Sequence, residues 1–142
     1  MLTAEENIRL PLELAGRTPP REWVDELIAA VGLGDRRRHR PSELSGGQQQ
    51  RAAIARALVS RPTVVFADEP TGNLDTNSSE EVLGLLRTAV ADLGQTVVMV
   101  THDAQAASVA GRIVVLRDGR VVHDGAGETT EGVLDLMKAV AA

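Results

Sequence analysis

The chain has 142 residues, of which 43% are apolar, and its 15 basic and 20 acidic side chains give a formal net charge of −5. These values suit a single domain with an ordinary core, and they argue against a disordered tail and against non-specific attraction to nucleic acid or anionic lipid. The lack of cysteine excludes a disulfide scaffold and a cysteine nucleophile, and the sequence, with its acidic start and no apolar run near the roughly 18 residues of a membrane span, predicts a cytoplasmic location.

The first forty residues are predicted to form two helices. Thr3 and Glu6 stand at the positions of a capping box, and Pro11 either closes or kinks the helix that they open. The second helix is predicted over residues 18–32, with two prolines near its start and a glycine at its end. Its apolar positions recur at helical spacing and are Trp23, Leu27, Ala30 and Val31.

A third helix is predicted from Ser45 to the residues before Pro62, with Gln48 at the capping-box position. Gly46 and Gly47 in its first turn let backbone N–H groups approach an anion closely, and the helix start adds partial positive charge. The segment is therefore either a phosphate site or an ordinary capping box, and these residues alone leave both interpretations open.

Two apolar, β-branched runs over residues 63–67 and 96–100 are typical of parallel strands that are buried on both faces. We expect Phe66, inside the first run, and Trp23 to pack in the core. The helix predicted between the runs ends at Gly94, and strand, helix and strand together predict one right-handed crossover. The apolar face of that helix comprises Val82, Leu83, Leu86, Val90 and Leu93.

The end of the chain is predicted to form a hairpin and a helix. Strands over residues 112–116 and 120–123 flank Asp118-Gly119, a strong two-residue turn signal, and an amphipathic helix covers residues 133–140. The fold class is therefore α/β, with only two buried parallel strands and a hairpin. Because such a sheet is thin, we expect the fold to be completed by something outside this chain.

Polar residues follow both predicted strands. Asp68 and Glu69 follow the first, where open α/β sheets bind ligands, so that one carboxylate can hold Mg²⁺ beside nucleotide phosphates and the other can deprotonate a water. The alternative is an acidic turn before Pro70. His102 follows the second strand, where it can contact a terminal phosphate or hold the base carboxylate, and the alternative is a histidine that caps a strand edge.

Four segments, in fixed order, resemble the signature motif, the Walker B motif, the D-loop and the switch histidine of ATP-binding-cassette (ABC) ATPases. They are Leu44-Ser45-Gly46-Gly47-Gln48-Gln49-Gln50-Arg51, Val64-Val65-Phe66-Ala67-Asp68-Glu69-Pro70, Gly72-Asn73-Leu74-Asp75 and Val100-Thr101-His102-Asp103. The resemblance covers essentially the whole chain, because the helical front is similar to the helical subdomain of that family and the hairpin and last helix are similar to its C-terminal end. It implies an α/β, P-loop NTPase cassette.

The resemblance assigns a role to each of these residues. It implies that Asp68 positions Mg²⁺, Glu69 is the catalytic base and His102 contacts the γ-phosphate of ATP. In that family ATP lies between two cassettes, so Asp75 would work across the dimer interface and Ser45–Gln48 would bind the γ-phosphate held by the partner cassette. The implied partners are a second cassette and a transmembrane permease. Through the permease, this chain would lie on the inner face of the cell membrane.

The sequence also departs from the family pattern. The phosphate-binding motif G-x-x-x-x-G-K-[ST] needs a lysine, and the only lysine here is Lys138, in the last predicted helix. The adenine-stacking aromatic residue and the Q-loop glutamine have no counterpart either. We therefore expect a partial cassette, with a helical subdomain over residues 1–60 and the C-terminal part of the ATPase core over residues 61–142. We expect the N-terminal strands and the phosphate-binding loop of the cassette to lie outside this sequence, and the chain alone to be inactive.

Residues 2–12 and 70–75 look most like the branch that contains lipoprotein-releasing, macrolide-export and cell-division-type transporter ATPases. One alternative is a non-enzymatic remnant or regulatory half-cassette that pairs with an intact cassette. Another is a cassette ATPase of DNA repair, but the short distance between signature and Walker B leaves no room for the insertions of those proteins. The basic run Arg36–Arg40 has no flanking aromatic residues, so we interpret it as a solvated loop that could touch a membrane partner, and we expect no nucleic-acid partner.

Overall fold

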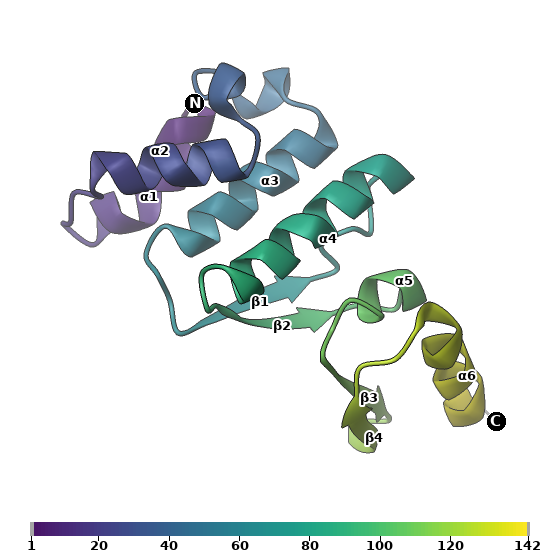
Figure 1. The fold of residues 1–142 in the computed structure, drawn as a ribbon. Coiled ribbons are helices and arrows are strands. Elements are labelled where there is room, and N and C mark those ends of the chain that lie inside the picture. Colours follow the sequence, from purple (N-terminus) through teal and green to yellow (C-terminus); the bar gives the residue numbers. More distant parts are fainter. Residues whose placement is uncertain (1, 142) are drawn as a thin grey trace.

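The structure is a computed structural model that describes residues 2–141, and it has a layer of helices on one side of a small parallel sheet (Figure 1). In chain order the elements are α1 (Ala4–Leu14), α2 (Arg21–Ala30), the 3₁₀ turns η1 (Gly34–Arg36) and η2 (Pro41–Glu43), α3 (Gly46–Leu58), β1 (Val64–Asp68), α4 (Thr76–Ala91), β2 (Thr96–Val100), α5 (Ala104–Ala107), β3 (Arg112–Arg117), β4 (Arg120–Ala126) and α6 (Thr130–Ala141).

Both predicted capping boxes are present, at Thr3 for α1 and at Ser45 for α3. Pro11 does not close α1, which continues to Leu14. A proline inside a helix removes one backbone hydrogen bond, but burial of Ile8 and Leu12 on the same face of α1 favours the longer helix.

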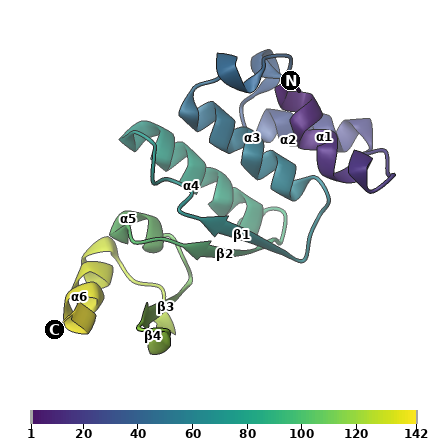
Figure 2. The ribbon, with the colours of Figure 1, turned by 180° about the vertical axis from the view of Figure 1, so that it is seen from behind.

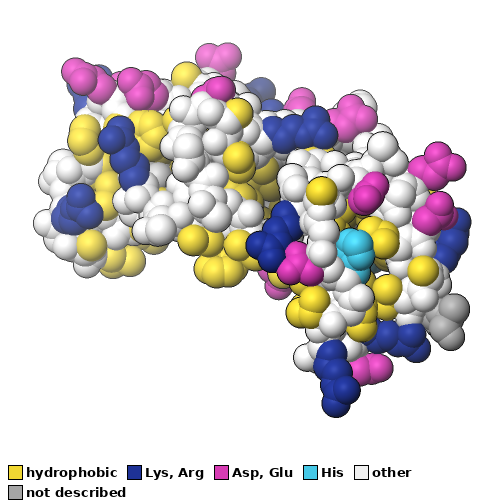
Figure 3. Space-filling view, turned by 60° about the horizontal axis from the view of Figure 1, so that its bottom comes forward, with side chains coloured by type: hydrophobic (Ala, Val, Ile, Leu, Met, Phe, Trp, Pro, Cys, Tyr) yellow, Lys and Arg dark blue, Asp and Glu magenta, His cyan; other side chains and the backbone are white. Residues whose placement is uncertain are grey.

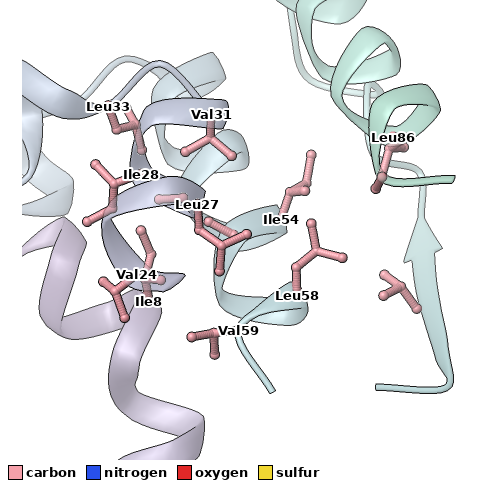
Figure 4. Close-up of a cluster of buried hydrophobic side chains, with 14 of the residues drawn as sticks. Ile8, Val24, Leu27, Ile28, Val31, Leu33, Ile54, Leu58, Val59 and Leu86 are labelled. Carbon is pink, nitrogen blue, oxygen red and sulfur yellow. The ribbon is translucent and has the colours of Figure 1, made fainter. Parts of the chain in front are cut away.

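The main core lies between the three N-terminal helices, α4 and the parallel sheet (Figure 4). Trp23 is half-buried at its edge and donates its indole N–H to the carbonyl oxygen of Val59 at 2.9 Å. Ala30, predicted on the buried face of α2, is exposed instead. The apolar side chains at the centre of this core are Ile8, Val24, Leu27, Ile28, Leu33, Val59 and Val82.

The strands β1 and β2 pair in parallel, from Val64 opposite Thr96 to Asp68 opposite Val100. The helix α4 covers one face of this pair, but its buried face differs from the prediction: Val90 is 50% exposed, and Ala89 is buried. The buried residues of α4 are Val82, Leu83, Leu86 and Ala89, and Val90 lies one residue before the helix ends at Ala91.

No helix among the described residues covers the opposite face of the parallel pair, as Figures 1 and 2 show. On it Phe66 is 78% exposed, and Val98 and Val100 are 43% and 58% exposed. The predictions that both strands are buried on both faces and that Phe66 packs in the core are therefore wrong for this chain. Figure 3 turns the underside of the molecule forward, where hydrophobic side chains lie on the surface.

The antiparallel pair β3–β4 forms a separate sheet that packs with α5 and α6 through Ala104, Ile113 and Val133. The predicted hairpin turn is confirmed, because Asp118 and Gly119 both have positive φ, 51° and 72°. No helix among residues 2–141 combines the length and the apolar content that crossing a membrane requires. The subdomain boundary at residue 60 stays a prediction.

Candidate functional site

The first cluster of predicted site residues lies where β1 and β2 end. The backbone N–H of Glu69 donates to the carbonyl oxygen of Val100 at 2.8 Å, which extends the ladder by one bond beyond the strand. Glu69 itself has a φ of 43°, in the left-handed region that non-glycine residues seldom adopt. The chain therefore turns sharply at Glu69, and the backbone N–H of Gly72 donates to the carbonyl oxygen of Glu69 at 3.2 Å.

Three donors hold the Glu69 carboxylate. Its Oε1 lies 2.7 Å from Nδ1 of His102 and accepts the His102 backbone N–H at 3.0 Å. Its Oε2 accepts the hydroxyl of Thr101 at 3.2 Å. Sequence reasoning paired Glu69 with His102 but gave no role to Thr101, although a hydroxyl residue next to the histidine was a usable signal.

The contact with His102 also sets the charge of the pair. The hydrogen bond from His102 lowers the pKa of Glu69, and the same bond raises the pKa of His102. The His102 side chain is 83% exposed and that of Glu69 is 35% exposed, so both can be reached from solvent. With Nδ1 engaged by the carboxylate, Nε2 of His102 is left for a ligand. The raised pKa favours the protonated ring, in which both nitrogens carry a hydrogen, so the pair can present a carboxylate base beside an imidazolium N–H donor.

Asp68, the predicted Mg²⁺ ligand, is exposed at the end of β1. Among residues 2–141 no three His, Asp or Glu side chains come together as a ready-made metal site. Mg²⁺ beside nucleotide phosphates is commonly held by one or two carboxylates, with water and phosphate oxygens as the other ligands. Asp68 fits that limited role.

The second cluster lies at the start of α3. Ser45 Oγ accepts the N–H of Gln48 at 3.2 Å, and Gln48 Oε1 accepts the N–H of Ser45 at 2.9 Å. Within residues 2–141 the backbone N–H groups of Gly46 and Gly47 have no hydrogen-bond acceptor. The capping box is thus present, and the two N–H groups at the helix start are also free to bind an anion.

The helices α3 and α4 run side by side (Figures 1 and 2), and Asp75 lies near the α3 start because Ser78, to which it is hydrogen-bonded, packs beside Gly47. Asp75 caps α4 by accepting the N–H of Ser78 at 3.0 Å and the hydroxyl of Ser78 at 2.8 Å, and these bonds lower its pKa. The structure therefore brings Glu69 to His102 and Asp75 to the α3 start. Within the described part of the chain no hydrogen bond or ion pair joins these two clusters.

Residues 1–72 match the sequence model of the ABC transporter family. The chain is 52% identical over 123 residues to an uncharacterised ABC transporter ATP-binding protein of Thermotoga maritima, covering 84% of this chain and 52% of that protein. It is 45% identical over 132 residues to the macrolide export ATP-binding/permease protein MacB of an Azoarcus species, covering 92% of this chain and 20% of that protein.

Among solved structures, the chain resembles the ATP-binding cassette MJ0796 in a dimeric, post-hydrolysis state bound to ADP and Pi. The TM-score is 0.75 and the sequence identity is 40%, over 90% of this chain and 58% of that one. This likeness confirms the predicted α/β cassette fold. The chain spans little more than half the length of this cassette and of the Thermotoga protein.

Proposed function

The chain belongs to the ABC transporter family, and we propose that it is part of the ATP-hydrolysing subunit that energises transport through a separate membrane protein. The single observation that carries this proposal is the contact of Glu69 with His102 where β1 and β2 end. Carboxyl ends of parallel strands are where open α/β sheets bind their ligands.

In the proposed reaction Glu69 accepts a proton from the attacking water, which its lowered pKa allows because it keeps the carboxylate ionised. His102 holds that carboxylate through Nδ1 and presents Nε2 to the γ-phosphate. Asp68 would hold Mg²⁺, and the ion would neutralise phosphate charge when bound.

The 142 residues supply these groups without a lysine that could hold the phosphates. Their only lysine, Lys138, is exposed in α6 and is not part of a G-x-x-x-x-G-K-[ST] motif. We therefore propose that the polypeptide alone neither binds ATP tightly nor hydrolyses it. Isothermal titration with Mg-ATP tests this, and a dissociation constant in the micromolar range would overturn it.

A second cassette completes the proposed site. The unpaired N–H groups of Gly46 and Gly47 suit a γ-phosphate held by the partner, and Asp75 lies beside them. This arrangement is supported by the cassette MJ0796, which is described as a dimer with ADP and Pi.

A permease is the second proposed partner, and it would hold the cassette at the cytoplasmic face of the membrane. MacB, to which the chain is similar, is named as an ATP-binding/permease protein, in agreement with the macrolide-export branch suggested by the sequence. We propose that the helical front, roughly residues 2–40, faces this permease. Arg36, Arg38 and Arg40 are exposed there, whereas Arg37 is bound to Glu5 and Asp25.

The test is ATP turnover by the polypeptide that the natural gene produces, measured for Glu69→Gln with Glu26→Gln as the matched control. Glu26 is exposed on α2, outside both clusters. We expect Glu69→Gln to abolish turnover and keep ATP binding, and Glu26→Gln to keep both. Measurable turnover that is equal in the two variants would refute the role of Glu69.

The lack of a phosphate-cradling lysine favours one second candidate, a regulatory half-cassette that offers the α3 start to the ATP of an intact partner. It predicts that adding this chain to an intact cassette changes the turnover of that cassette. The intact mass of the natural gene product separates the candidates, because a product of 15.1 kDa favours the regulatory role and a heavier product that includes a G-x-x-x-x-G-K-[ST] segment favours the enzyme.

A further inference from the structure

Gly47 and Ser78 touch where α3 and α4 begin. A methyl group at Gly47 would lie 2.8 Å from Oγ and 2.9 Å from Cβ of Ser78, closer than side chains tolerate. Gly47 is buried for this reason, although it stands in the first turn of a helix whose cap, Ser45, is exposed. The missing side chain at position 47 thus makes room for Ser78 as well as for an anion.

Ser78 in turn holds Asp75. Its hydroxyl donates to Oδ2 of Asp75 at 2.8 Å and its backbone N–H donates to Oδ1 at 3.0 Å. One side chain therefore contacts the α3 start on one side and fixes the Asp75 carboxylate on the other.

Two further contacts keep the helices in this register. Leu74 lies next to Gly46, where a methyl group would be 3.5 Å from Cδ2, an ordinary packing distance. One turn farther along α3, Nη1 of Arg51 pairs with Oε2 of Glu81 on α4 at 2.8 Å. Several contacts therefore join the α3 start to α4 and the segment before it, and Ser78 makes the one that also involves Asp75.

We infer that Ser78 is a positioning residue that couples the segment Ser45–Gln48 to the side chain of Asp75. The inference deepens the proposed function, on which its meaning rests, because both segments would then act as one unit on the nucleotide held by a partner cassette. It also gives Gly47 a role that Gly46 does not share, because Ser78 packs beside Gly47 and Leu74 beside Gly46.

The test uses the full 142-residue chain and needs no nucleotide. The pKa of Asp75 is measured by NMR titration, and Tm by thermal unfolding, for Gly47→Ala and for the matched control Gly46→Ala. We expect Gly47→Ala to raise the pKa of Asp75, because displaced Ser78 no longer donates to it, and to lower Tm by about 4–10 °C, as overpacking in a domain of this size does. Gly46→Ala should leave the pKa of Asp75 unchanged.

Two more variants keep the test decisive if Gly47→Ala does not fold. Ser78→Ala removes the hydroxyl alone and should raise the pKa of Asp75. Gly47→Ala combined with Ser78→Gly removes the clash, so this double variant should unfold at a higher Tm than Gly47→Ala, or fold where Gly47→Ala does not. A double variant that is no more stable than Gly47→Ala, or an Asp75 pKa that is the same in all variants, would overturn the inference. If the chain passes these tests but Glu69→Gln leaves the ATP turnover of the natural gene product unchanged, the proposed function is refuted instead.

Discussion

The helix α4 offers a sharp test of the fold, because two valines on it have different surroundings. Val82 is fully buried against the main core, whereas Val90 is 50% exposed, although the sequence pattern placed both on one face. We predict that Val82→Ala destabilises the chain and that Val90→Ala, the same chemical change on the same helix, does not.

The magnitude follows from burial. Each variant removes two methyl groups, and full burial of two such groups is worth about 1.6 kcal/mol. A residual cavity of about 40 Å³ at position 82 adds about 1 kcal/mol, and the better helix propensity of alanine returns about 0.5 kcal/mol. The expected loss for Val82→Ala is thus about 2 kcal/mol. At position 90 half the burial, about 0.8 kcal/mol, is nearly offset by the propensity gain, which leaves a change within about 0.5 kcal/mol.

Urea unfolding followed by circular dichroism measures both variants. With a slope of about 2 kcal/mol per molar urea for a domain of this size, Val82→Ala should lower the midpoint by about 1 M. The midpoint of Val90→Ala should stay within about 0.3 M of the parent. Equal losses in the two variants would refute the packing of α4 described above and favour the face predicted from periodicity.

Three further outcomes are expected. The contact of Glu69 with His102 raises the pKa of His102 above its ordinary 6.5 and lowers that of Glu69 below its ordinary 4.5. The contact should therefore stabilise the fold fully between pH 4.5 and 6.5, and this stabilisation should be lost as the pH rises through the raised pKa of His102 or falls through the lowered pKa of Glu69. An NMR titration should accordingly show a lower His102 pKa in Glu69→Gln, and an unchanged value would contradict the contact. Trp23→Phe should cost about 1 kcal/mol in urea unfolding, since the indole bond to Val59 is lost, and parent-like stability would speak against that bond. Neutralising the exposed arginines of the run Arg36–Arg40 should leave retention on heparin unchanged. A marked loss of retention would contradict the expectation that the chain has no nucleic-acid partner.

Local signals in the sequence were sufficient for much of the fold. Capping boxes depend on residues three positions apart, so Thr3 and Ser45 marked the starts of α1 and α3 correctly. The Asp118-Gly119 turn was predictable for the same reason, because positive φ at two successive residues selects few residue types. Order along the chain also placed Glu69 and His102 at the ends of neighbouring strands.

Burial depends on which elements cover which face, and the sequence by itself did not determine it. Phe66 has the apolar aromatic side chain of a typical core residue, yet it is exposed because no helix among residues 2–141 covers its face of the sheet. Ala89 is buried on α4 and Val90 is exposed, although helical periodicity allows a residue at either position to lie on the apolar face. The sequence determined the elements and the chemical groups at their ends, whereas only the tertiary structure decided that Ser78 fills the space beside Gly47, since that contact joins residues 31 positions apart.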